Sequence, residues 1–199
     1  MTERSITQMF PKPVFKMSQP EAEWHNENIL EEISKLEFVK NYGNVISKNN
    51  YILNEPQFKP LRDAIQEELN LVISEYYERP EIQLYITQSW FNINEDDDHH
   101  PSHCHSNSFM SGSMYLQTGF DDAIMFSDPS INFRINILPN SKYPEVRLPV
   151  TKGDIILFDS LIYHSVEKVK RKTKRISLAF NTWFKGTVGN PNLLTELRL

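Results

Sequence analysis

The 199-residue sequence predicts an α+β fold that is mainly β, a jelly roll backed by N-terminal helices. Three observations predict it. Apolar residues recur at helical spacing before residue 80, short runs rich in Ile, Val, Phe, Tyr and Leu follow, and Gly, Asn, Asp and Pro separate those runs. Because no long helical period interrupts the runs, a parallel sheet with crossover helices is not expected.

Residues 1–80 are expected to form an extended lead-in and two packing helices. Three prolines keep the first twenty residues extended. A rough apolar stripe over Glu21–Lys40 predicts the first helix, and the sequence Asn-Tyr-Gly-Asn stops it. Over Asn54–Tyr77 the apolar residues recur at steps of three and four, so the second helix has one face to bury against a larger body.

Residues 81–185 are expected to form the jelly-roll core. Eight runs predict its strands: Ile82–Ile93, Phe109–Gln117, Ala123–Phe126, Ile131–Leu138, Val146–Val150, Asp154–Phe158, Tyr163–Val169 and Lys174–Phe184. Residues 186–199 are expected to be a C-terminal tail of the same structural domain. The tail packs as a short helix or serves in dimer contacts, so a homodimer stays open.

Composition narrows the classes of function. The 21 Lys and Arg against 26 Asp and Glu give a net charge of −5, which offers no electrostatic reason to bind nucleic acid. The single cysteine excludes a disulfide framework and a zinc finger. The apolar runs are too short to span a membrane, and the N-terminus has no apolar signal core. We therefore expect a soluble cytoplasmic protein with neither a nucleic acid nor a membrane as partner.

Histidines are the first candidates for chemistry, since His99, His100, His103 and His105 lie within seven positions. Side chains two apart on a strand share a face, so His103 and His105 can hold one metal ion, and imidazole suits Fe, Zn, Cu and Ni. His164 follows a Gly-Asp turn and an apolar strand. Because the two sheets of a jelly roll face each other, His164 can supply a third ligand from a distant strand. His99, His100 and the acidic run before them are expected to form a solvated loop.

The strand after His164 carries a second candidate. Arg175, Ser177, Ala179 and Asn181 share one face of it by alternation. A guanidinium offers a planar bidentate fork, so an arginine next to a metal suits an anionic cosubstrate. The alternative is that Arg175 is only the last member of the basic cluster that begins at Lys168.

Together these segments resemble the Fe(II)/2-oxoglutarate-dependent oxygenase superfamily, over roughly residues 82–184. The likeness is carried, in chain order, by Ser89-Trp90-Phe91-Asn92, His103-Cys104-His105, Ser108–Leu116, Gly153–Phe158, His164 and Arg175–Asn181. The closest likeness is to a phage and bacterial branch with an H-x-H…S-G-x-x-Y pattern. A phage source would make the host cytoplasm the expected location.

The resemblance implies a double-stranded β-helix (a cupin-like jelly roll) and a role for particular residues. His103 matches the first iron ligand and His164 matches the distal one. Arg175 and Ser177 match the Arg-x-Ser pair that binds the far carboxylate of 2-oxoglutarate. Tyr115 is placed to add a hydroxyl contact to the same cosubstrate.

Position 105 departs from the superfamily, which has Asp or Glu there. We predict a three-histidine site of His103, His105 and His164. The alternative is a shifted pair with a different third ligand, for which Asp98 and Asp159 are the nearer acids in the sequence.

The activity implied by the resemblance is that of an Fe(II)- and 2-oxoglutarate-dependent dioxygenase. It would hydroxylate a small molecule or a protein side chain with O2, while 2-oxoglutarate is decarboxylated to succinate and CO2. Two alternatives remain. One is a cupin-like three-histidine metalloprotein, either an isomerase or a cosubstrate-free dioxygenase. The other is a non-catalytic binding module whose H-x-H loop lies at the surface.

Overall fold

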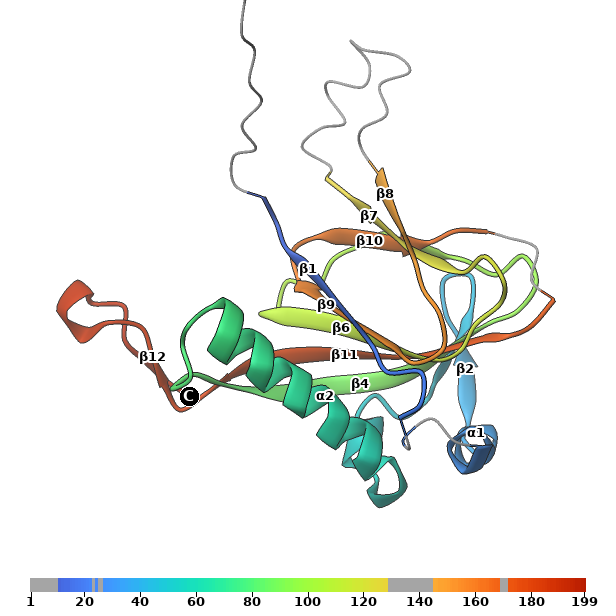
Figure 1. The fold of residues 1–199 in the computed structure, drawn as a ribbon, viewed down its shortest axis with the longest axis horizontal. Helices are drawn as coiled ribbons and strands as arrows, with labels where there is room; N and C mark the ends of the chain where they lie inside the picture. Colours follow the sequence, from blue (N-terminus) through green and yellow to red (C-terminus); the bar gives the residue numbers. More distant parts are fainter. Residues whose placement is uncertain (1–10, 23, 25–26, 129–144, 169–171) are drawn as a thin grey trace, which may run out of the picture.

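The computed structural model describes residues 11–22, 24, 27–128, 145–168 and 172–199. Most of its strands form two antiparallel sheets, with α2 (Lys59–Leu71) along the outer face of the larger one (Figure 1). The larger sheet has the order β1 (Val14–Ser18), β9 (Asp154–Asp159), β6 (Met110–Gln117), β11 (Arg175–Lys185), β4 (Gln83–Asn94), β3 (Val45–Ser47) and β2 (Phe38–Lys40). The smaller has the order β5 (His100–His103), β10 (Tyr163–Val166), β7 (Ala123–Ser127) and β8 (Glu145–Pro149).

Strands far apart in the sequence are neighbours in both sheets, as in a jelly roll, so the predicted fold class is confirmed. Seven of the eight predicted runs overlap an observed strand. The eighth, Ile131–Leu138, lies outside the described residues. Runs of buried Ile, Leu, Val and Phe form strands here because both faces of the larger sheet are covered, one by α2 and the other by the smaller sheet.

The two N-terminal helices are shorter than predicted. Within the described residues of the stripe over Glu21–Lys40, the α-helix is α1 (Glu27–Ser34), and the last residues of the stripe form β2. β2 pairs with β3, so the predicted stop signal is a hairpin turn in which Gly43 has a φ of 113°. The β-branched and aromatic residues of both arms favour this pairing over another helical turn.

The second predicted helix, Asn54–Tyr77, begins late. Two 3-10 turns, Ile52–Asn54 and Pro56–Phe58, precede α2, and a π-helical turn, Val72–Tyr76, follows it. The predicted apolar face packs against the larger sheet, where the rings of Phe58 and Phe91 are 5.1 Å apart.

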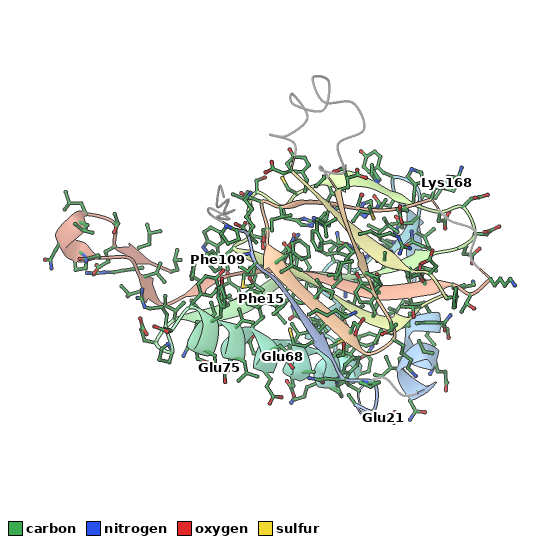
Figure 2. The ribbon with its side chains drawn as sticks, turned by 45° about the horizontal axis from the view of Figure 1, so that its top comes forward. Phe15, Glu21, Glu68, Glu75, Phe109 and Lys168 are labelled. Atoms are coloured by element: carbon green, nitrogen blue, oxygen red, sulfur yellow. The ribbon has the colours of Figure 1, made fainter. Side chains whose placement is uncertain are left out.

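The extended lead-in supplies an edge strand of the larger sheet, because β1 pairs with β9 along its whole length. Just after β1, Gln19 donates a hydrogen bond from Nε2 to Oε1 of Glu68 at 2.5 Å. Figure 2 labels Phe15 on β1 and Glu68 on α2, among the side chains that fill this region. Residues from the first 80 positions are therefore part of the sheet that carries the site.

The tail forms a hairpin of β12 (Thr187–Val188) and β13 (Leu197–Arg198), joined through a 3-10 turn, Pro191–Leu193. It contains no α-helix and extends away from the two sheets (Figure 1). Its leucines are exposed, and the homodimer stays a prediction. No helix in the described ranges has both the length and the apolar character needed to cross a membrane.

The Gly-Asp turn before β9 has a structural role that supports the sheet. Asp154 is buried at the start of β9 and accepts hydrogen bonds from Ser18 Oγ at 2.5 Å and from the Thr151 backbone N–H at 2.7 Å. Its Oδ2 also lies 2.9 Å from Nζ of Lys16. Burial alone would raise the pKa of Asp154, but these hydrogen bonds outweigh it and lower that pKa below its ordinary value.

We predict that Asp154→Asn lowers the free energy of unfolding by about 1–3 kcal/mol at pH 7, because it weakens a buried charge-assisted network. The folded-state pKa is the lower one, so the carboxylate stabilises the fold above the unfolded pKa of 3.8. This stabilisation disappears as the pH falls through the folded-state pKa. Urea unfolding of both proteins at pH 7 and below pH 4 measures the difference. Asp63→Asn is the control, since Asp63 pairs with Lys59 in an exposed ion pair and should change little.

Candidate metal and anion site

A cavity of about 510 Å³, open solvent at its mouth included, lies between the two sheets. Residues from both sheets line it. Its polar lining includes His103, His105 and His164 together with Arg175 and Ser177, all five of which were singled out from the sequence. The structure thus brings the predicted metal ligands and the predicted anion-binding residues to one space.

Three imidazoles meet at one end of this cavity. The candidate ligand atoms of His103, His105 and His164 all lie within 4.8 Å of one another. β10 runs antiparallel to β5 with His164 directly opposite His103, which explains how residues 61 positions apart come together. Iron-group and zinc ions bind imidazole nitrogens at about 2.1 Å, so this cluster is of the size that holds one ion.

The ring orientation of two of these histidines is set by the backbone. Nδ1 of His103 lies 2.8 Å from the Pro101 carbonyl, and Nδ1 of His164 lies 3.0 Å from the Ile162 carbonyl. A carbonyl can only accept, so each Nδ1 carries the hydrogen and each Nε2 keeps its lone pair. Such outer hydrogen bonds fix the tautomer that a metal needs.

Two of the three ligands are kept neutral by their surroundings. Burial, together with the neighbouring His103, lowers the pKa of His164 to about 3 and that of His105 to about 4. Neutral imidazole is the form that binds a metal ion. The donor set therefore suits a transition metal such as iron.

His105 reaches the site in a different way from the one predicted. β5 ends at His103, so the two histidines do not lie on one strand. Instead, the His105 backbone N–H donates to the Ser160 carbonyl at 2.8 Å. Ser160 belongs to a buried hydroxyl network in which Ser111 Oγ lies 2.8 Å from Ser160 Oγ and donates to Asn181 Oδ1 at 2.8 Å. The Ser-Gly segment after the H-x-H pair thus supports the position of His105.

No carboxylate joins the three imidazoles in the described part of the chain. Asp159, one of the two acids considered from the sequence, accepts a hydrogen bond from the Leu161 backbone N–H at 2.8 Å and so stabilises a turn. Asp98 accepts one from the Glu95 backbone N–H at 2.8 Å, within the acidic loop. The geometry favours the three-histidine arrangement over a shifted pair.

Arg175 is buried at the cavity wall, 2% exposed. Its Nη1 donates to the Ala123 carbonyl at 3.2 Å and its Nη2 donates to the Tyr115 hydroxyl at 3.3 Å, but Nε has no partner among the described residues. The described residues that line the cavity include no Asp or Glu. A buried guanidinium whose described partners are all neutral is costly unless an anion joins it, so this part of the cavity suits an anionic group.

Ser177 lines the cavity two positions along β11 from Arg175, on the same face as predicted. Tyr115 is placed differently. It is buried and does not line the cavity, and its ring centroid lies 5.1 Å from the guanidinium carbon of Arg175. Burial raises the pKa of Tyr115, so its hydroxyl stays protonated. The structure therefore gives Tyr115 the role of holding Arg175, and the direct contact with a cosubstrate stays a prediction.

Sequence reasoning missed one histidine of the site. His100 was expected in a solvated loop, but it lines the cavity, and its ring centroid lies 4.3 Å from that of His103. Burial lowers its pKa to about 4. The β2–β3 hairpin lies against it, with Nδ2 of Asn41 3.4 Å from Nε2 of His100. His99, by contrast, is exposed as expected.

Sequence reasoning also missed three asparagines: Asn44, Asn92 and Asn94. Asn44 donates from Nδ2 to Oδ1 of Asn92 at 3.3 Å. Asn92 and Asn94 share a face with Trp90 by alternation along β4, which extends one residue past the strand predicted at Ile82–Ile93. That alternation is the signal that could have found two of the three, while Asn44 reaches the cavity only through the unpredicted hairpin.

Comparison with known proteins agrees with this geometry. Residues 88–181 match a family model described as "Putative 2OG-Fe(II) oxygenase". Among solved structures, the chain is similar to HygX from Streptomyces hygroscopicus, crystallised with nickel, 2-oxoglutarate and hygromycin B (TM-score 0.61, 13% identity, 86% of this chain and 82% of that chain). A search of curated proteins finds no match.

Two further structures share the fold. One is an oxidoreductase of the 2OG-Fe(II) oxygenase family from Burkholderia pseudomallei (TM-score 0.58, 12% identity, 84% of this chain and 83% of that chain). The other is the non-heme alpha ketoglutarate dependent epimerase SnoN from nogalamycin biosynthesis (TM-score 0.64, 12% identity, 86% of this chain and 78% of that chain). At these identities the likeness concerns the fold.

Proposed function

We propose that this chain is an Fe(II)- and 2-oxoglutarate-dependent oxygenase of the 2OG-Fe(II) oxygenase superfamily, whose family model matches residues 88–181. In this proposal His103, His105 and His164 hold the metal. Arg175, with Ser177 beside it, binds the far carboxylate of 2-oxoglutarate. Fe(II), 2-oxoglutarate and O2 are the reactants that the site requires besides the substrate.

The observation that carries the proposal is the buried Nε of Arg175, which has no partner among the described residues and belongs to a residue that lines the same cavity as the three imidazoles. A metal site alone needs no buried cation nearby, because like charges repel. A chelating anion with a second, distant carboxylate explains both groups at once. It can bind the metal at one end and the guanidinium at the other.

The residues of the chain then have separate tasks. The histidines hold the ion and leave coordination positions open for other ligands. Arg175, held by Ala123 and Tyr115, orients the cosubstrate. When bound, Fe(II) supplies the redox chemistry that couples the decarboxylation of 2-oxoglutarate, to succinate and CO2, to oxidation of the substrate by O2.

Hydroxylation of a small molecule or a protein side chain is the reaction we propose. The structural neighbours include an epimerase and a carbocyclase, so the fold also accommodates other oxidative outcomes. HygX was crystallised with hygromycin B, and a small-molecule substrate is accordingly the first class to screen here. Mass spectrometry distinguishes the outcomes, because hydroxylation adds one oxygen atom to the substrate and epimerisation leaves the mass unchanged.

We predict that the wild-type protein releases succinate from 2-oxoglutarate when Fe(II), ascorbate and O2 are present, slowly even without a substrate. Release should stop when the metal is chelated or when O2 is removed. Chromatographic quantification of succinate in the three conditions measures it. Succinate that forms equally without iron would contradict the proposal.

A cupin-like three-histidine enzyme that uses no cosubstrate is the second candidate, and the absence of a carboxylate from the described ligand cluster favours it. The two candidates differ in an anaerobic experiment. Addition of 2-oxoglutarate to the Fe(II)-loaded protein should change the visible absorption of the metal if the oxygenase proposal holds. An unchanged spectrum supports the second candidate, and protein that holds no metal at all supports a non-catalytic binding module.

A further inference from the structure

Two buried side-chain nitrogens in the described part of the chain have no hydrogen-bond partner: Nε of Arg175 and Nδ2 of Asn94. The two residues are 2% and 1% exposed. Buried donors without partners are rare in folded proteins, because each loses its hydrogen bonds to water and gains nothing in return. Each such group therefore calls for a physical explanation.

The two donors are neighbours. β11 pairs with β4 in a register that sets Arg175 directly opposite Asn94. Side chains at directly opposite positions of an antiparallel pair lie on the same face, with Cβ atoms about 5 Å apart. Both residues line the cavity that holds the three imidazoles. The unpaired donors thus share one end of one cavity.

The described residues supply no acceptor for them there. The terminal nitrogens of Arg175 are already bonded to Ala123 and Tyr115, which fixes the guanidinium in place. The described cavity wall contains no Asp or Glu. The other amide on this face of β4, Asn92, accepts a hydrogen bond from Asn44 at its Oδ1, and its Nδ2 is not among the buried nitrogens that lack a partner. A bound molecule can then supply the acceptor for both free donors.

We propose that Asn94 is a second donor to the carboxylate that Arg175 binds, and that the pair selects a dicarboxylate 2-oxo acid over a monocarboxylate one. The inference rests on the proposed function, and it adds a binding residue outside the Arg-x-Ser pattern. A carboxylate has two oxygens and about four acceptor positions, so it can accept from Nε of Arg175 and from the amide together. An acid at position 94 would instead pair with Arg175 and repel the ligand.

Asn94→Leu tests the inference, because leucine has a similar volume and cannot donate. The probes are 2-oxoglutarate and pyruvate, which share the 2-oxo acid group but differ in the far carboxylate. Titration calorimetry is carried out on Ni(II)-loaded protein without O2. We expect binding of 2-oxoglutarate to weaken about tenfold and binding of pyruvate to stay unchanged. Asn94→Asp should weaken 2-oxoglutarate binding about a hundredfold.

Thermal unfolding of the metal-free protein provides a readout that a merely structural role would not give. Asn94→Leu removes an unpaired buried donor, so its unfolding temperature should equal or exceed that of the wild type. Gln88→Leu, an exposed amide on the same strand, is the matched control and should leave the affinity for both probes unchanged. The expected pattern is thus weaker binding of one ligand in a protein that is no less stable.

Three results would count against the inference in different ways. If Asn94→Leu binds 2-oxoglutarate as tightly as the wild type, while Arg175→Met does not, Asn94 is not a ligand-binding residue and the proposed function stands. If Asn94→Leu unfolds at a lower temperature and weakens both probes equally, the role of Asn94 is structural. If the metal-loaded wild type binds no 2-oxoglutarate, the proposed function itself is wrong.

Discussion

Replacing His164 with alanine is expected to abolish stable metal binding and to reduce succinate release to the level of the enzyme-free background. His164 is the most buried of the three imidazoles, and the Ile162 carbonyl fixes the tautomer that exposes its Nε2. Loss of an outer partner of a ligand already costs 10–100-fold in metal affinity. Loss of the ligand itself should therefore cost at least about 100-fold. Elemental analysis of dialysed, untagged protein measures the bound metal, and the succinate assay measures turnover.

His99→Ala is the matched control for that variant. His99 belongs to the same cluster in the sequence, but it is exposed and does not line the cavity. It should retain wild-type metal content and turnover. The ring of His164 also packs against Phe158, with centroids 4.7 Å apart, so circular dichroism is needed to show that His164→Ala is folded. A folded His164→Ala protein that retains stoichiometric metal would rule out the three-histidine site.

The part of the site that could be predicted from the sequence depends on short-range patterns. Alternation along one strand is enough to put Ser177 on the same face as Arg175, and the structure has both at the cavity wall. His103 and His164 could be assigned because the order of motifs along the chain resembles that of a family. Neither inference needs knowledge of which strands pair.

The parts that were missed depend on long-range packing. Four acidic residues, Glu95–Asp98, precede His99 and His100, and nothing local distinguishes the two histidines. His100 is half-buried because the β2–β3 hairpin, itself predicted as the end of a helix, brings Asn41 against it. A local helical period could not reveal that hairpin, because its stability comes from pairing with β4.

The pairing of Asn94 with Arg175 was also beyond sequence reasoning. The register of β4 and β11 shifts between Asn181 and Thr182, so counting from one end of the two strands assigns the wrong partner at the other. A shift of one position would move Asn94 to the opposite face of the sheet relative to its partner. That the two free donors, on Arg175 and Asn94, are neighbours can therefore be recognised only from the observed register.

Arg175→Met is expected to weaken 2-oxoglutarate binding about a hundredfold while it changes the stability of the metal-free protein by less than about 1 kcal/mol. The first effect follows from the loss of charge-assisted hydrogen bonds in a dry cavity. The second follows from two opposing changes. Methionine relieves a buried charge that has no acid partner in the described part of the chain, but it also leaves Ala123 and Tyr115 without their donor. Calorimetry with 2-oxoglutarate and urea unfolding measure the two quantities.

Lys174→Met is the control that decides between the two interpretations of Arg175. Lys174 is the preceding residue and belongs to the basic cluster, but its side chain is exposed and pairs with Glu95. If Arg175 were only the last member of that cluster, the two variants would weaken binding alike and high salt would abolish the difference from wild type. If Arg175 is the anion anchor, only Arg175→Met loses affinity, and salt changes the result little because the guanidinium is shielded from solvent. Because Arg175 is buried and its neighbour Lys174 is exposed, the comparison of the two variants tests whether Arg175 binds the anion.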